Sequence, residues 1–289
     1  TYYAFMQAME KDKYKNSLNE QEKLTLEYLS KTILSGVRPD ELAILSQLLY
    51  KDHIGTADFI KEYQKTYGIE ISTLQVNEAI QVLQGHFVSK EAEYQKFCQI
   101  DILENDQSGM IRRLQSYTER LAHIQFYTQV EDIIKVGIAR YKDKYFPGRI
   151  VDSPFVLYEK YSRRDVSLLM NCGKDLSSIM YGMKRIEDDV FIFITYHKEE
   201  SQDEKNYVDG KPDYADAFED DLIFKWDSQI GKGLDSSYMK DVLEAERKHL
   251  LVKKSDAETS FYYMGQFTVV EARNARKEDN RGRMQPITK

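Results

Sequence analysis

The sequence predicts an α+β protein with two domains: an all-helical domain at residues 1–148 and, at residues 149–289, a curved mixed sheet or small barrel with two helices. Two patterns predict this fold class. In the first half, apolar residues recur every three or four positions, as on the buried face of a helix. In the second half, short runs rich in β-branched and aromatic residues favour strands. The pattern changes near Pro147 and Gly148, and 289 residues are enough for two cores.

Helices account for the first domain. Their apolar stripes are bounded by residues typical of helix ends, such as Pro39 near the start of one helix and Gly68 and Gly85 after two others. The predicted helices cover residues 18–35, 38–50, 56–67, 72–84, 110–124 and 126–145.

A winged helix is expected at residues 38–104. Three short helices are followed there by two short strands, within HFVS (residues 86–89) and KFCQIDILE (residues 96–104). The helix in the recognition position carries Glu78 and no Lys or Arg. Its Asn and Gln side chains could contact bases. We favour the alternative, in which this winged helix is a structural spacer or a protein-contact module.

Strands dominate the second domain. They are expected within SSIMYGMKRI (177–186), DVFIFITYHK (189–198), DLIFKWDS (221–228), HLLVKKS (249–255) and FYYMGQFTVVEA (261–272). Helices are expected after Ser162 and after Ser236, each serine being a favourable N-cap. The acidic segment 199–221 is expected to be a solvated loop.

Charge and composition limit the function. The net charge of −7 argues against a protein that coats nucleic acid nonspecifically, because such binding needs many Lys and Arg contacts to phosphates. Residues 187–221 carry 13 acidic and 3 basic side chains, whereas residues 271–289 carry 6 basic and 3 acidic ones. Any nucleic-acid surface must therefore be local. No apolar run approaches the roughly 20 residues of a membrane span. Two cysteines without metal-ligand spacing fit a cytoplasmic protein, and Thr1 suggests a fragment of a longer chain.

Cofactor and metal motifs are absent from the sequence. It has no phosphate-binding loop, dinucleotide fingerprint or HExxH motif, and its five histidines are scattered. We therefore expect no cofactor, no metal site and no catalytic residue in this fragment. One nuclease-like pattern exists, a PD…ExK spacing formed by Asp213, Glu246 and Lys248, but we expect the last two at a helix end and Asp213 in the acidic loop. A nuclease is accordingly the third and weakest interpretation.

Eight residues are candidates for a nucleic-acid-binding site. Two arginines directly follow the expected N-cap serine, where a helix N-terminus and two guanidiniums could bind a phosphate; alternatively, Glu159 and Asp165 pair with them on a solvated surface. The only tryptophan, in FKWDSQ, could stack on a base, although a core position is the interpretation we favour. The candidates are Ser162, Arg163, Arg164, Trp226, Ser228, Gln229, Arg273 and Arg276.

Several segments also carry a family resemblance. FVLYEKYSRRDVSLLMN, FIFITYHKEE, FKWDSQ, HLLVKKSD and FYYMGQFTVVEA, in this order, resemble the uncharacterised domain at the C-terminal end of bacterial superfamily-two DEAD/DEAH-box helicases, many of which carry a phospholipase-D-like nuclease domain. LSGVRPDELAILSQLL resembles the helical segment that precedes that domain. The resemblance covers roughly residues 20–289 and is more specific in the second half. Five of the candidates match its recurrent motifs: Arg163, Arg164, Trp226, Ser228 and Gln229.

The resemblance implies a role without catalysis. The ATPase and nuclease motifs of such proteins lie outside this fragment, so it should have neither activity alone. The preferred interpretation is an accessory module of a restriction or phage-defence helicase-nuclease. Its partners would be DNA and the motor and nuclease domains of the parent chain, and no membrane. A protein-interaction or autoinhibitory module is the alternative, favoured by the negative net charge.

Overall fold

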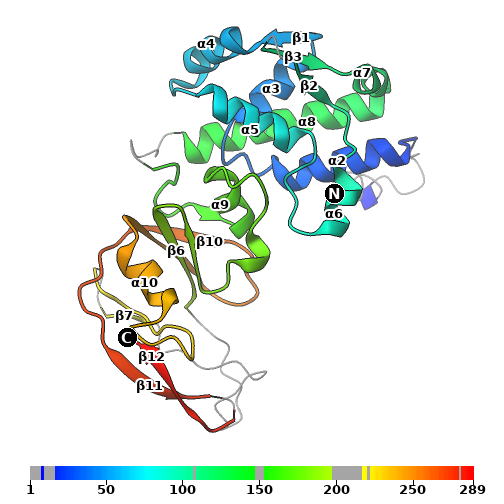
Figure 1. Cartoon of the computed structure of the whole chain (residues 1–289). Coiled ribbons are helices and arrows are strands. Elements are labelled where there is room, and N and C mark those ends of the chain that lie inside the picture. Colours follow the sequence, from blue (N-terminus) through cyan, green and yellow to red (C-terminus); the bar gives the residue numbers. More distant parts are fainter. Residues whose placement is uncertain are drawn as a thin grey trace. The chain divides into compact units, whose positions relative to one another are not determined.

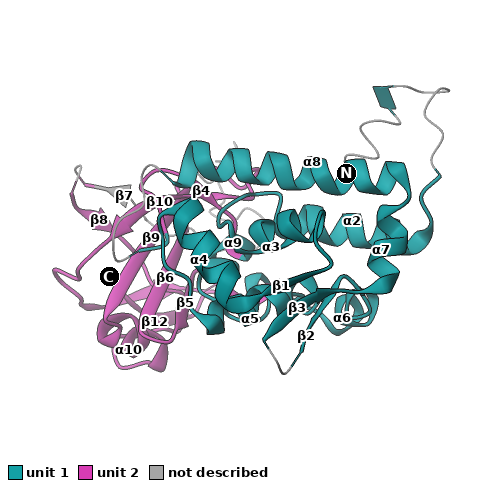
Figure 2. Ribbon diagram, turned by 90° about the horizontal axis from the view of Figure 1, so that it is seen from above, with its two compact units in different colours: residues 1–154, 164–177 teal, residues 155–163, 178–289 magenta. Residues whose placement is uncertain are grey.

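Figure 1 shows the computed structural model of the chain. The structure describes residues 8–9, 17–106, 109–146, 153–196, 217–219, 222–279 and 281–289. These residues divide into two compact units (Figure 2): unit 1 comprises residues 1–154 and 164–177, and unit 2 comprises residues 155–163 and 178–289. The polypeptide enters unit 2 after Pro154, returns to unit 1 at Arg164 and enters unit 2 again at Ser178.

Unit 1 is mainly helical. Its elements are α2 (Glu20–Thr32), α3 (Asp40–Leu48), β1 (His53–Gly55), α4 (Thr56–Tyr67), α5 (Thr73–Leu83), α6 (Glu91–Phe97), β2 (Leu103–Asn105), β3 (Met110–Arg113), α7 (Gln115–Leu121) and α8 (Ile124–Arg140), which continues into a π-helical turn at Tyr141–Tyr145. Helix α9 (Arg163–Leu169) begins at the last residue of unit 2 and lies otherwise in unit 1.

Local sequence signals explain several of these helices. Asn19 and Glu22 form a reciprocal capping box at the start of α2, and Ser72 and Gln75 form another at the start of α5. Helix α4 ends at Gly68, whose φ of 65° lies in the left-handed region that glycine adopts readily. The helices predicted at these positions are confirmed.

The middle of unit 1 has the topology of a winged helix. Its elements follow in the order α3, β1, α4, α5, α6, β2, β3, which is that of a winged helix with one helix, α6, inserted before the wing; the three strands form an antiparallel sheet in the order β1-β3-β2. Helix α5 occupies the recognition position, and the β2–β3 ribbon is the wing. Asn105 of the wing donates a hydrogen bond of 2.8 Å to Asn77 Oδ1 on α5. The last strand of this sheet ends at Arg113, beyond residue 104, where the predicted winged helix ends.

Two predicted elements inside this region are wrong. Residues 86–89 form no strand, because Phe87 and Val88 are buried by helix packing, and the amide of Phe87 donates to the hydroxyl of Tyr28 on α2. Residues 110–113 are a strand rather than the first turn of a helix, because Ile111 is fully buried opposite Ile54 of β1. Tertiary packing overrides the helical spacing at both places.

Two arginines fix residues 164–177 within unit 1. Arg38 is buried beside Glu41 and Asp40, to which it is ion-paired, and also donates to the carbonyl of Leu168 and to Asn171 Oδ1. Burial alone would lower the pKa of the Arg38 guanidinium, but the two carboxylates raise it, so the group stays charged. The second arginine, Arg164, is described with the candidate site.

Unit 2 is built on a five-stranded mixed sheet. Its strands are β4 (Lys160–Tyr161), β10 (Phe261–Gln266), β9 (Arg247–Lys253), β6 (Asp189–Thr195) and β5 (Met183–Ile186), in that spatial order. A 3-10 turn lies at Ser177–Ile179. Two small ribbons accompany the sheet, one of β7 (Ala217–Phe218) with β8 (Phe224–Lys225) and one of β11 (Asn274–Glu278) with β12 (Met284–Thr288).

The sheet is curled and covered by one helix. Strands β6 and β9 run parallel, and the other neighbours are antiparallel. Parallel strands need a crossover, which includes α10 (Ser237–Glu244). Met239 and Val242 of α10 are buried in the same core cluster as Ile192 and Leu250 of the sheet. A bulge at Gly265, whose φ is 105°, bends β10. The predicted α+β fold class is confirmed.

The structure corrects or leaves open the remaining predictions for this half. The strand expected at residues 221–228 covers only Phe224–Lys225, and the β11–β12 ribbon lies where the sequence predicts no strand pair. Pro147 and Gly148 lie outside the described residues, as does most of the acidic segment 199–221.

A buried polar cluster lies inside unit 2. Asp189 Oδ1 lies 2.7 Å from His249 Nε2, and its carboxylate accepts two hydrogen bonds from the guanidinium of Arg247 at 2.8 and 2.9 Å. The other ring nitrogen of His249 lies 2.9 Å from the hydroxyl of Tyr263, and Phe191 stacks on the imidazole at 4.6 Å. Burial lowers the pKa of His249. Burial alone would raise the pKa of Asp189, but hydrogen bonds from Arg247 and His249 lower it.

This cluster predicts that unit 2 loses stability in acid. The unfolded chain takes up a proton at His249 near pH 6.5, whereas the folded chain resists it, so the free energy of unfolding falls as the pH drops below about 6.5. Protonation of Asp189 adds a further loss in stronger acid, below about pH 4. Urea unfolding followed by the fluorescence of Trp226, the single tryptophan, measures this in unit 2.

A pair of variants isolates the histidine. His249→Gln should flatten the pH dependence of the free energy of unfolding between about pH 7 and about pH 5. Changing the exposed His53 of unit 1 to Gln should leave this pH dependence unchanged. A parent protein whose unfolding midpoint is constant or rises on acidification would contradict this assignment.

Candidate nucleic-acid interface

The two consecutive arginines do not form one site. Arg164 Nη1 donates to Asp175 at 2.8 Å, and its Nη2 donates to Thr32 Oγ1 at 3.0 Å and to the carbonyl of Phe87 at 3.1 Å. All three partners belong to unit 1. The Arg164 charge is therefore used within unit 1, and the structure does not bring its guanidinium together with the other candidates. Ser162, the preceding candidate, is half-buried next to β4.

Arg163 lies instead among aromatic rings of unit 2. Its guanidinium carbon is 4.9 Å from the ring centroid of Phe261, 5.2 Å from that of Tyr181 and 5.3 Å from that of Phe193. Phe193 and Phe261 are buried, whereas Tyr181 is 64% exposed. Burial lowers the pKa of Arg163. The rings offset part of the desolvation cost by cation–π attraction, so a partly desolvated cation is held against an exposed tyrosine.

Trp226 is half-buried rather than a fully enclosed core residue. It packs against the hydrophobic cluster of unit 2 and stacks on Tyr238, with ring centroids 6.3 Å apart and an interplanar angle of 23°. Lys232 Nζ lies 5.8 Å from the centroid of Tyr238. The tryptophan thus belongs to a pair of partly exposed rings with a cation beside it.

Ser228 and its neighbour Asp227 fasten the β11–β12 ribbon. Ser228 is fully buried; its amide donates to the carbonyl of Thr288 at 2.9 Å, and its Oγ accepts from the Thr288 amide at 2.8 Å. The buried carboxylate of Asp227 lies 3.5 Å from Lys277 Nζ and 3.8 Å from Lys289 Nζ. Ser228 is therefore a structural residue that holds strand β12, and Asp227 is a residue that sequence reasoning missed.

Gln229 lies between Tyr181 and the ring pair of Trp226 and Tyr238. Its Nε2 donates to the carbonyl of Tyr181 at 3.0 Å. Gly182 follows with a φ of 72°, and a Cβ at this position would lie 2.7 Å from Gln229 Nε2 and 3.4 Å from the hydroxyl of Tyr238. We call Arg163, Tyr181, Tyr238, Trp226 and Lys232 the aromatic strip, because contacts through Gln229 and Gly182 connect them within unit 2. Neither tyrosine carries a local sequence signal.

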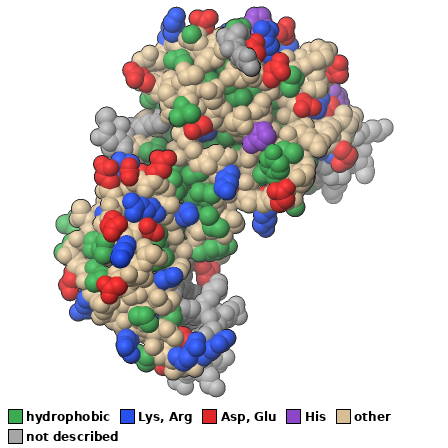
Figure 3. All heavy atoms as spheres, viewed as in Figure 1, with side chains coloured by type: hydrophobic (Ala, Val, Ile, Leu, Met, Phe, Trp, Pro, Cys, Tyr) green, Lys and Arg blue, Asp and Glu red, His purple; other side chains and the backbone are tan. Residues whose placement is uncertain are grey.

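Arg273 and Arg276 are exposed on the basic ribbon, by which we mean residues 273–289. Arg276 pairs opposite Pro286 in the register, and Arg273 exchanges backbone hydrogen bonds with Lys289. Neither arginine forms an ion pair with a described residue. In Figure 3, Lys and Arg side chains gather at the lower end of unit 2, where Figure 1 draws β11 and β12.

A buried acid shapes the turn of this ribbon. Asp279 accepts hydrogen bonds from the backbone amides of Arg281 and Arg283 and from the side chains of Arg283 and Gln285. These bonds hold the pKa of Asp279 well below its usual value. The turn is thereby fixed, and the charge of Arg283 is partly compensated.

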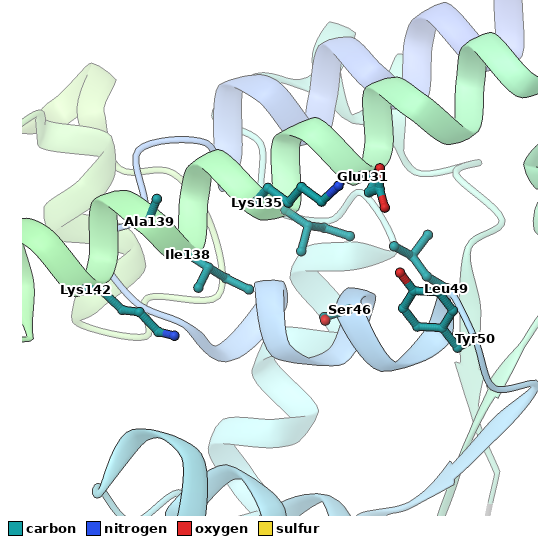
Figure 4. Close-up of a pocket in the computed structure, with 9 residues that line it drawn as sticks. Ser46, Leu49, Tyr50, Glu131, Lys135, Ile138, Ala139 and Lys142 are labelled. Carbon is teal, nitrogen blue, oxygen red and sulfur yellow. Dashed lines mark ion pairs between the residues drawn. The ribbon is translucent and has the colours of Figure 1, made fainter.

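Unit 1 also has an open groove, shown in Figure 4. It encloses about 350 Å³ between the last turn of α3 and the second half of α8. Leu49, Ile134 and Ile138 make it apolar, and Lys135 and Lys142 stand at its rim. None of the eight candidate residues lines this groove.

The nuclease-like pattern is not assembled by the described residues. Asp213 lies outside them, and Lys248 is the second residue of β9 rather than part of a helix end. Its Nζ donates to the carbonyl of Ala245. Within the part of the chain that the structure describes, no group of His, Cys, Asp and Glu could hold a metal, and no helix is long and apolar enough to cross a bilayer.

The role of Ser228 can be tested by Ser228→Ala. This change removes the acceptor of the buried Thr288 amide, which should cost about 1–3 kcal/mol and loosen the basic ribbon. Hydrogen exchange should speed up at residues 274–288 while β6 and β9 stay protected. The exposed Thr259→Ala in the same unit is the control and should change neither region. Unchanged exchange at residues 274–288 would show that Ser228 does not hold the ribbon.

Comparison with known families finds one match in each half of the chain. Residues 155–289 match a domain of unknown function, DUF3427, and residues 1–144 match a second domain of unknown function, DUF8090. No curated protein matches the chain. The DUF3427 region contains all of unit 2 and also residues 164–177, which pack in unit 1. The aromatic strip and the basic ribbon both lie within the region that is similar to DUF3427.

Proposed function

We propose that this chain is a non-catalytic accessory module of a DNA helicase-nuclease involved in restriction or phage defence, in which unit 2 binds DNA. The observation that carries the proposal is the basic ribbon, whose exposed Arg273 and Arg276 stand on a two-stranded element fastened to the unit by Asp227 and Ser228. The resemblance of the second half to the C-terminal domain of such helicases supports the context, as does the DUF3427 match.

The physical argument rests on where the positive charge lies. The chain has a net charge of −7, so nonspecific attraction to DNA over its whole surface is weak. The basic ribbon concentrates cations on a short, rigid element, and two-stranded ribbons fit the grooves and backbone of DNA. Since the backbone of the ribbon is already held in place by hydrogen bonds, only its side chains need ordering on binding.

A second candidate function is suggested by the winged helix of unit 1. Helix α5 carries no Lys or Arg, Leu74 is 67% exposed near its start, and Asn77 is already bonded to the wing. These features suit contact with protein better than contact with phosphates. In this role unit 1 would dock on another domain of the parent chain or hold the motor inactive.

The double variant Arg273→Gln/Arg276→Gln tests the DNA-binding proposal. Each phosphate contact contributes roughly 0.9 to the slope of log affinity against log salt on duplex DNA. The double variant should therefore weaken binding to a short fluorescent DNA and reduce that slope by about one to two units. Fluorescence anisotropy over a range of salt concentrations measures both quantities.

A charge-matched control separates local contacts from net charge. Lys61→Gln/Lys65→Gln removes two exposed cations from α4 in unit 1 and should leave the affinity and the slope nearly unchanged. Equal weakening by both double variants would attribute binding to overall charge. A parent protein with no measurable affinity for DNA would refute the proposal and would favour the protein-interaction function.

A further inference from the structure

We infer that the aromatic strip of unit 2 binds an unpaired base, so that the DNA recognised carries single-stranded nucleotides rather than being a uniform duplex. The inference rests on the proposed DNA binding and names its substrate class. It starts from Tyr181, a large aromatic side chain that is 64% exposed although the unit has a buried core available.

The backbone of Tyr181 is fixed by hydrogen bonds. Its carbonyl accepts hydrogen bonds from Gln229 Nε2 at 3.0 Å and from the amide of Met183 at 2.8 Å. Gly182, in the left-handed region, lets the chain turn closely past Gln229. One face of the ring is occupied by the guanidinium of Arg163. An exposed ring with a cation on one face is a ready platform for a planar group on the other.

The planar group that fits this platform in DNA is a base. Aromatic side chains stack on bases of any sequence, and a neighbouring arginine strengthens the stack. The second ring pair, Trp226 with Tyr238, lies beside Lys232 and provides a further partly exposed aromatic surface in the same connected set.

Phosphate contacts are available from the same part of unit 2. The loop that contains Gln229 and Lys232 is bonded to the basic ribbon through the amide of Gly231, which donates to the carbonyl of Pro286 at 2.9 Å, and through the Leu234 amide, which donates to Asn274. Rings and cations are therefore parts of one fixed framework. Combined stacking and backbone contact is the arrangement by which proteins hold single strands.

Unpaired bases are required because a duplex hides the faces of its bases. In a duplex only the edges of the bases and the phosphates are accessible, so an aromatic ring can stack only on a base that is unpaired or has left the helix. The strip thus distinguishes single strands, junctions and extruded bases from regular duplex DNA.

The test compares three fluorescent probes on the whole chain: a single-stranded oligonucleotide, the duplex of the same sequence, and a single strand of the same length made of abasic sugar-phosphate units. We expect the parent to bind the first probe most tightly. Tyr181→Ala should weaken single-strand binding roughly fivefold or more, with an unchanged salt slope and unchanged duplex and abasic binding. Tyr181→Phe should restore affinity, because it keeps the ring.

Two further variants make the result decisive. Tyr181→Leu keeps apolar bulk without an aromatic face and should behave like Tyr181→Ala. The exposed Tyr50→Ala in unit 1 should bind like the parent. Trp226 fluorescence during thermal unfolding verifies that each variant is folded.

The failure of this inference is distinguishable from the failure of the proposed function. A parent that binds the single strand, the duplex and the abasic strand equally, with no effect of Tyr181→Ala, would overturn the inference and leave DNA binding by the basic ribbon intact. A parent that binds none of the three probes would overturn both and would point to a protein as the ligand of the exposed ring.

Discussion

The ion pair between Arg164 and Asp175 joins the two ends of the segment 164–177, and Arg164 also bonds this segment to Thr32 and Phe87 of unit 1. Asp175 is buried and needs a charged partner, and Arg164 supplies one from the opposite end of the segment 164–177. Arg38 then reaches Leu168 and Asn171 within the same segment. Successive helical residues point about 100° apart, so Arg163 does not share the partners of Arg164; within unit 2 it lies against the rings of Phe261, Tyr181 and Phe193.

Of the two consecutive arginines, only Arg163 belongs to unit 2. Arg164 is committed to structure, whereas Arg163 is placed against Tyr181, whose ring is exposed. The FKWDSQ motif has a divided role: Trp226 takes part in the aromatic strip, and Asp227 and Ser228 hold the basic ribbon. A short motif that resembles a binding site is thus mainly the support on which a binding surface is built.

The sequence was most informative where structure is determined locally. The capping box of Ser72 and Gln75 and the long apolar run of β6 were sufficient to predict their elements. The strand β3 and the ribbon β11–β12 were not predictable, since each is stabilised by residues distant in the sequence, such as Ile54 for Ile111 and Ser228 for Thr288. The side chains of Arg163 and Arg164 contact partners up to 132 positions away in the sequence. Tyr181 carried no signal, because exposure is a tertiary property.

The central claim is that unit 2 binds DNA through the aromatic strip and the basic ribbon. Hydrogen exchange of the whole chain, with and without a saturating single-stranded oligonucleotide, tests it most directly. The account predicts slower exchange on binding around Gly182, at residues 228–232 and along residues 273–289, with no change in α5 of the winged helix. Protection confined to α5 and the β2–β3 wing, or the absence of any protection, would contradict it.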